Sequence, residues 1–179
     1  MTEVPATETL LSLLNADLRA ARAGAEPSLM SGLARYFVDP GFATVVRYRL
    51  SVFARRFGKV GRVLSKLMWL YNVRVSACYL SPSSRIGPGL SLPHAAAVVV
   101  GDGVVAGRDL QLYQSVTLGQ RGTQYPCIGD GVIIFAGACV LGSLQVGDDA
   151  VVGANAVVLR SVPPRSTVAG VPARELAGK

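Results

Sequence analysis

The chain has 179 residues and a formal net charge of +7, and half of its residues are apolar. This length fits one domain with a small appendage. The longest apolar runs, such as 132–141, are far below the roughly 18 residues that a membrane span requires. The mean hydropathy of +0.40 therefore predicts apolar surface that other subunits cover. The charge predicts anionic ligands, but no nucleic-acid-binding motif accompanies it.

Residues 1–74 are predicted to form a helical region. Residues 1–8 carry two acids and no basic run, which is atypical of a secretory signal. Apolar residues at helical spacing predict a helix over 8–22, which ends before Gly24 and Pro27.

Further helices are predicted over residues 28–37 and 41–57, and over 60–72. Asp39 and Pro40 are typical of a helix start, with Asp as the cap and Pro at the first helical position. The glycine at position 58 is expected to end the third of these helices.

Residues 47–74 contain eight basic residues and no acidic residue. The pattern is typical of the solvated face of a helical cap. A surface for an anionic membrane or an acidic partner is the alternative. The basic residues are Arg47, Arg49, Arg55, Arg56, Lys59, Arg62, Lys66 and Arg74.

Residues 75–179 are organised by a repeat of six. An aliphatic residue recurs at every sixth position from 128 to 158, and upstream at 100, 106 and 112. This period indicates hexapeptide repeats and hence a parallel β-helix, in which three units make one triangular coil. An antiparallel sandwich of short strands is the alternative, but its period of two would not hold register at six.

Each repeat is expected to bury its aliphatic residue against the coils above and below. A second, mostly small residue four positions later fills the corner. These second residues are Val104, Leu110, Val116, Val132, Ala138, Leu144, Ala150 and Ala156.

The repeat is interrupted twice. Between Ile86 and Val100 the spacing is fourteen, two more than two repeats, and the extra residues follow Pro93 and His94. A loop over 119–127 precedes the next unit. Function is expected at such irregularities because the coil itself is filled with core.

His94 is the single histidine of the chain. It lies beside the first interruption and can accept a proton from a hydroxyl or amine near neutral pH. Cys78, Cys127 and Cys139 lack the spacing of metal ligands. We expect these three cysteines to be small core residues of a protein in a reducing cytoplasm.

Residues 75–176 resemble the hexapeptide-repeat acetyltransferases. The match is carried by Ile86-Gly87-Pro88-Gly89-Leu90-Ser91-Leu92-Pro93-His94, by Val99-Val100-Gly101, by Leu112-Tyr113-Gln114-Ser115-Val116-Thr117-Leu118-Gly119 and by the closing segment 162–174. Residues 39–50 are also similar to the helical segment that precedes the coils. The resemblance is to the serine acetyltransferase branch, and within it to relatives that acetylate sugars and polysaccharides.

The resemblance implies a left-handed parallel β-helix, a homotrimer or dimer of trimers, and acetyl-CoA as donor without a metal. It implies His94 as the general base, which activates an acceptor hydroxyl in a cleft between neighbouring subunits. The residues placed along CoA are Gly119, Gln120, Ala136, Gly137 and Ala154, with Arg165 and Arg174 for phosphate. The residues placed near the acceptor are Tyr79, Tyr113, Gln114, Gln124 and Tyr125.

Three positions depart from serine acetyltransferases, which carry an Asp before the base, an Asp that orients it and an Arg-His pair in the loop. Here these positions are Pro93, Tyr79 and Gln124-Tyr125. Unpaired acceptor charges would be costly in such a site. A small uncharged or sugar-like acceptor, including a glycan, is therefore predicted. Serine itself, a natural-product intermediate and a non-catalytic scaffold are alternatives, and the length of the acyl group stays open.

Overall fold

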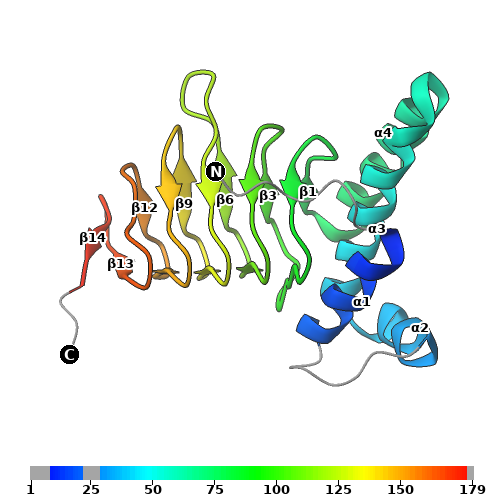
Figure 1. Ribbon diagram of the computed structural model, residues 1–179, viewed down its shortest axis with the longest axis horizontal. Helices are drawn as coiled ribbons and strands as arrows, with labels where there is room; N and C mark the ends of the chain where they lie inside the picture. The colour runs from blue at the N-terminus through cyan, green and yellow to red at the C-terminus, as the bar shows by residue number, and fades with distance from the viewer. Residues whose placement is uncertain (1–8, 22–28, 177–179) are drawn as a thin grey trace.

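The computed structural model describes residues 9–21 and 29–176. The predictions for residues 1–8 and for the end of the first helix near Gly24 and Pro27 lie outside the described residues. Four α-helices lie at one end of the molecule, and a three-sided coil of strands extends away from them (Figure 1).

The helices are α1 (Leu10–Ala21), α2 (Leu29–Val38), α3 (Pro40–Ala54) and α4 (Gly58–Ser76). Asp39 caps α3 as predicted, since its Oδ1 accepts hydrogen bonds from the backbone N–H groups of Gly41 at 2.8 Å and Phe42 at 3.1 Å. A 3₁₀ turn (Arg55–Phe57) separates α3 from α4, and α4 begins at Gly58, which has φ +66°. The last helix is longer than predicted and runs to Ser76.

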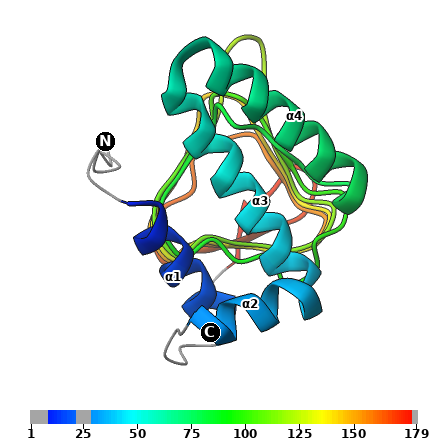
Figure 2. The same ribbon diagram turned by 90° about the vertical axis from the view of Figure 1, so that its right-hand side faces the viewer.

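Fourteen short strands form three faces in the described residues, and a view along the axis shows a triangular cross-section (Figure 2). Face A contains β1 (Tyr79–Leu80), β3 (Val99–Val100), β6 (Thr117–Gly119), β9 (Cys139–Leu141) and β12 (Val157–Val158). Face B contains β2 (Arg85–Ile86), β4 (Val105–Ala106), β7 (Cys127–Ile128) and β10 (Gln145–Val146). Face C contains β5 (Gln111–Leu112), β8 (Ile133–Ile134), β11 (Val151–Val152), β13 (Thr167–Ala169) and β14 (Arg174–Glu175).

The strands pair in parallel in the register that the repeat predicts. On face A, Val99 pairs with Thr117, 18 residues on, which is three repeats. The pair Tyr79 and Val99 spans 20 residues because of the two extra residues near His94. β14 pairs antiparallel with β13 and closes the end. The predicted left-handed parallel β-helix with a helical N-terminal region is therefore confirmed.

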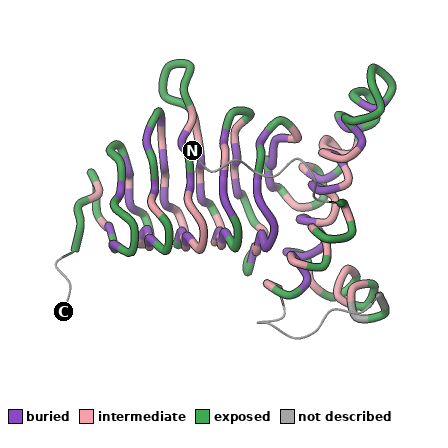
Figure 3. The backbone as a smooth tube through the Cα atoms, viewed as in Figure 1, coloured by how far each residue is buried: buried purple, intermediate pink, exposed green. Residues whose placement is uncertain are grey.

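The core is a continuous aliphatic cluster, and buried residues recur in every coil along the axis (Figure 3). Every residue predicted to point inward from 100 to 158 is at most 6% exposed. Cys78 belongs to this core, but Cys127 is exposed and Cys139 is half-buried, so the prediction of three core cysteines is wrong for these two. Both directly precede an inward residue and so point outward.

A buried ion pair joins the helices to the first coil. Arg49 Nε lies 2.8 Å from Asp17 Oδ2, and the Arg49 guanidinium also donates to the carbonyl oxygens of Ile86 and Gly87 at 2.6 Å. Asp17 Oδ1 accepts from the backbone N–H groups of residues 89–90 at 2.9 and 2.8 Å. Arg49 is only 4% exposed and Asp17 is fully buried. Arg49 is therefore part of the interior and not of the predicted basic face.

Two further contacts from α3 hold the same coil. Tyr48 Oη lies 3.0 Å from Ser84 Oγ, and burial raises the pKa of this phenol. Gly41 lies so close to the carbonyl of Leu92 that no Cβ would fit between them. The segment that leads to His94 is thus fixed from the helical side.

Replacing Asp17 by Ala is expected to lower the free energy of unfolding by about 3–5 kcal/mol, because a buried guanidinium then loses its carboxylate. Urea unfolding followed by circular dichroism measures this change. The matched control is Arg108→Ala on the exposed surface, for which we expect a change within about 0.5 kcal/mol. Equal effects of the two substitutions would contradict the account of the ion pair.

Candidate active site

His94 lies at the corner between faces C and A. Ser91, three residues earlier, pairs with Gln111 of face C, and β3 of face A begins five residues later. The His94 side chain is exposed. The extra residues of the first interruption therefore present the imidazole outside the core.

The same corner recurs in each coil and forms a column along the molecule. Ser115 N–H donates to Ala96 at 2.9 Å, and Gly137 N–H donates to Gln114 at 2.9 Å. Asn155 N–H donates to the Ala136 carbonyl at 2.8 Å, which extends the column to a fourth coil. We call this column, residues 93–97, 113–115, 135–137 and 153–155, the His corner. It brings together His94, Tyr113, Gln114, Ala136, Gly137 and Ala154 from the predicted site.

An aromatic ladder runs along the His corner. The ring centroids of His94 and Tyr113 lie 6.1 Å apart, and Tyr113 stacks on Phe135 at 4.9 Å. Gln111 Nε2 lies 3.3 Å from Tyr113 Oη. Gln114 Oε1 is buried without a hydrogen-bond partner among the described residues. Phe135 is the member of the ladder that the sequence analysis missed.

The His corner contains no Asp, Glu, Lys or Arg side chain. The Tyr79 ring makes an edge contact with Trp69 of α4, with centroids 4.9 Å apart. The His94 ring lies next to the ring of Tyr113 and not next to that of Tyr79 in the ring contacts of the described residues. The candidate base therefore lies beside a neutral, aromatic surface along the His corner.

The extended loop lies at a different corner, between faces A and B, where it projects from the coils (Figure 1). It follows β6, so Gly119, Gln120 and Gln124 lie on this side, and Arg121 N–H donates to the Gln124 carbonyl at 3.1 Å. The Tyr125 ring covers residues 101–103, where the two glycines leave room for it. Face A separates the loop from the His corner of the same chain.

Three arginines, one of them from the loop, line a single pocket. Arg121, Arg160 and Arg174 line a pocket of about 240 Å³ together with Leu159, Pro172 and Ala173. The predicted phosphate ligand Arg165 lies elsewhere, at the corner between faces B and C, where its N–H donates to the Asp148 carbonyl. Arg121 and Arg160 were missed because the loop and the last coil approach each other only in the folded chain.

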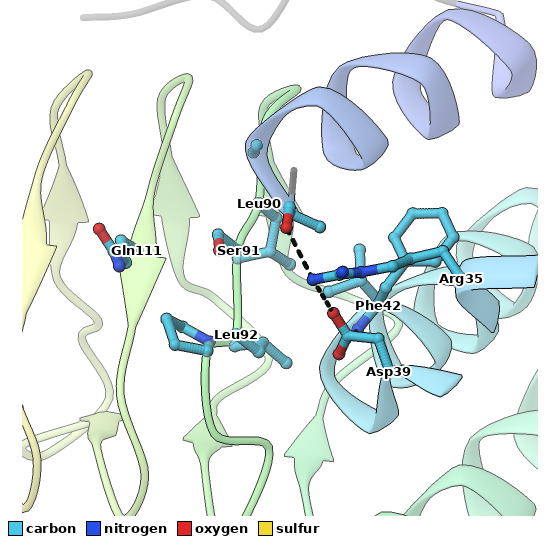
Figure 4. A pocket seen from close by; sticks show the side chains of 11 residues that line it. Arg35, Asp39, Phe42, Leu90, Ser91, Leu92 and Gln111 are labelled. Atoms are coloured by element: carbon cyan, nitrogen blue, oxygen red, sulfur yellow. Dashed lines mark hydrogen bonds and ion pairs between the residues drawn. The ribbon is translucent and has the colours of Figure 1, made fainter. Parts of the chain in front are cut away.

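A second cavity, of about 290 Å³, lies between the helices and the first coil, beside Pro93 (Figure 4). Arg35 and Asp39 cross it as an ion pair at 2.6 Å. Arg35 Nη2 also donates to the carbonyl of Ala21 at 2.8 Å. The charges in this cavity compensate each other. Among residues 9–21 and 29–176, no three His, Cys, Asp or Glu side chains are grouped as metal ligands would be.

Comparison with known proteins assigns the family, although no family model matches the chain. Serine acetyltransferase of Mycobacterium tuberculosis is 36% identical over 167 residues, which cover 91% of this chain and 72% of that protein. The enzyme of Escherichia coli is 41% identical over 141 residues, but the match covers only 50% of its length. The solved structure of soybean serine acetyltransferase with serine matches at TM-score 0.83 and 38% identity, over 93% of this chain and 69% of that one.

The β-helix, the exposed imidazole and these relatives define an acyltransferase of the hexapeptide-repeat class. The chain belongs to the serine acetyltransferase family. The predicted resemblance to this class is confirmed. The finer placement beside sugar-modifying relatives is corrected, since the relatives found are serine acetyltransferases.

Proposed function

We propose that the chain transfers the acetyl group of acetyl-CoA to the hydroxyl of a small acceptor, with His94 as general base. The imidazole removes the hydroxyl proton as the oxygen attacks the thioester carbonyl carbon. The carbon–sulfur bond then breaks, and the CoA sulfur receives the proton from the imidazolium. The products are an acetyl ester and the free thiol of CoA.

The position of His94 is the observation that carries this proposal. The side chain is exposed at a corner where the repeat is interrupted, and the clamp of Asp17 and Arg49 holds the preceding backbone. A general base must be held at a fixed distance from the proton that it removes. The rigid coil provides that constraint without burying the ring.

Serine is the first acceptor to consider. The relatives are serine acetyltransferases, and one matching structure contains serine. Serine offers the primary hydroxyl that this chemistry requires.

A neutral acceptor is the second candidate, and the composition of the His corner favours it. A zwitterion needs partners for its ammonium and carboxylate groups, because unpaired charges are costly in a site. The His corner instead contains uncharged side chains, among them Gln114 and the ring of Tyr113. Such neutral and aromatic surfaces suit a sugar or another uncharged alcohol.

We infer that a neighbouring copy completes the site. The predicted acceptor and CoA residues are divided between the His corner and the loop corner, with face A between them. In a homotrimer, or in a dimer of trimers, the loop of one copy would lie beside the His corner of the next. Rotational symmetry repeats such a contact at every interface of the ring.

The pocket of Arg121, Arg160 and Arg174 is proposed to hold the phosphates of CoA. Guanidinium groups bind phosphate through two parallel hydrogen bonds, which makes arginine well suited to this role. Arg121, the loop residue that lines the pocket, directly follows Gln120 in the chain. This proposal keeps Arg174 from the sequence analysis and replaces Arg165 by Arg121 and Arg160.

Replacing His94 by Ala is expected to lower kcat about 10²–10⁴-fold, the usual contribution of a general base. The assay follows thiol release from acetyl-CoA with L-serine and with neutral sugars. An unchanged rate would remove His94 from the mechanism. Absence of turnover by the unmodified protein with every acceptor would instead favour a non-catalytic scaffold.

The two acceptor candidates are separated by comparing L-serine with N-acetylserinamide, which keeps the hydroxyl but carries no charge. Because the His corner provides no charged partner, we expect kcat/KM for L-serine to exceed that for the amide by less than about ten-fold. A site that pairs both charges would prefer L-serine by about 10⁴-fold. That result would exclude the neutral candidate.

Changing Arg160 to Gln is expected to raise KM for acetyl-CoA about ten-fold, since a charge-assisted hydrogen bond to phosphate is lost. Arg165→Gln is the matched control and should leave KM for acetyl-CoA unchanged. Both values come from initial rates at saturating acceptor. If Arg165→Gln raised KM for acetyl-CoA and Arg160→Gln did not, the phosphates would bind near Arg165, at the corner between faces B and C.

A further inference from the structure

Helix α4 carries an exposed apolar stripe. Val60, Leu64, Leu67, Tyr71 and Val75 are 80%, 50%, 59%, 58% and 51% exposed. Their spacing of four, three, four and four residues places them on one side of the helix. Five adjacent apolar side chains of this size are unusual on a surface that faces only water.

A basic row lies next to this stripe. Lys59, Arg62 and Lys66 are exposed and follow one another at spacings of three and four residues. Arg74 is also exposed. The helix has no acidic residue along its length. The exposed half of α4 therefore combines apolar and positive surface.

The charge distribution argues against a second copy as the occupant of this surface. The described part of the helical region contains two acidic residues, Asp17 within α1 and Asp39 as the N-cap of α3, and each already forms an ion pair. Packing one described helical region against another would bring the basic rows together, while the two carboxylates described there are already paired. Like charges in contact are destabilising.

An anionic lipid bilayer satisfies both parts of the surface. Apolar side chains enter the boundary between headgroups and acyl chains, while Lys and Arg meet the phosphates. At its 19 residues, α4 is roughly 28 Å long. Among the described residues, no helix is both long and apolar enough to cross a membrane. The helix would lie in the plane of the surface.

The position of α4 is compatible with this contact. The helix stands at the end of the molecule opposite β14, and one of its ends projects beyond the coils (Figures 1 and 2). We propose that the exposed stripe and basic row of α4 dock the protein on anionic membrane surfaces. This inference is independent of the acetyl acceptor.

The test is co-sedimentation with vesicles of phosphatidylglycerol and phosphatidylcholine, compared with phosphatidylcholine alone. The unmodified protein should bind only the anionic vesicles, and less at high salt. Replacing Lys59, Arg62 and Lys66 by Gln should lower the partition coefficient about 100-fold, or about five-fold per charge. Leu64→Ser with Leu67→Ser should weaken binding as well.

The matched control replaces Arg19, Arg85 and Arg108 by Gln, which removes the same charge from other exposed positions. This control should lose less than about five-fold, and thermal melting should show that every variant is folded. An equal loss in the control, or binding to neutral vesicles, would overturn the proposal. So would a protein that binds no vesicles but changes its mass in light scattering when Leu64 and Leu67 are replaced, since the stripe would then lie between copies.

Discussion

The aliphatic stack inside the coils is the interaction on which the rest of the structure depends. A single coil cannot bury its inward residues, so each coil is stable only against its neighbours. Parallel pairing at a fixed register then aligns every corner into a column. Residues can be inserted at a corner without disturbing this core, as they are beside His94 and in the loop after β6.

Much of the fold could be predicted because its core is periodic in sequence. The inward positions recur every six residues, and the cap formed by Asp39 is a local signal. The burial of Arg49 could not be predicted in this way. Its partners are a carboxylate 32 residues away and two carbonyls of the first coil. Only the packing of α1 and α3 on the coil brings these groups together.

The residues of the candidate site also fall into two groups, those that a sequence pattern indicates and those that only the folded chain brings together. His94 could be predicted because the repeat breaks beside it. The separation between the His corner and the loop follows from the coil, since β6 carries the chain across face A before the loop begins. The meeting of Arg121, Arg160 and Arg174 depends on the loop, the last coil and the closing hairpin, which no local pattern relates. Phe135 reaches Tyr113 for the same reason.

The central claim is that the His corner of one copy works with the loop of another, and subunit complementation tests it most directly. One variant carries His94→Ala, and in a second Gln120, Arg121 and Gln124 are each changed to Ala. Each variant alone should lose most of its activity, whereas refolding an equal mixture should restore about one quarter of the sites in a trimer. Mixed oligomers without activity above that of the parents would contradict the account.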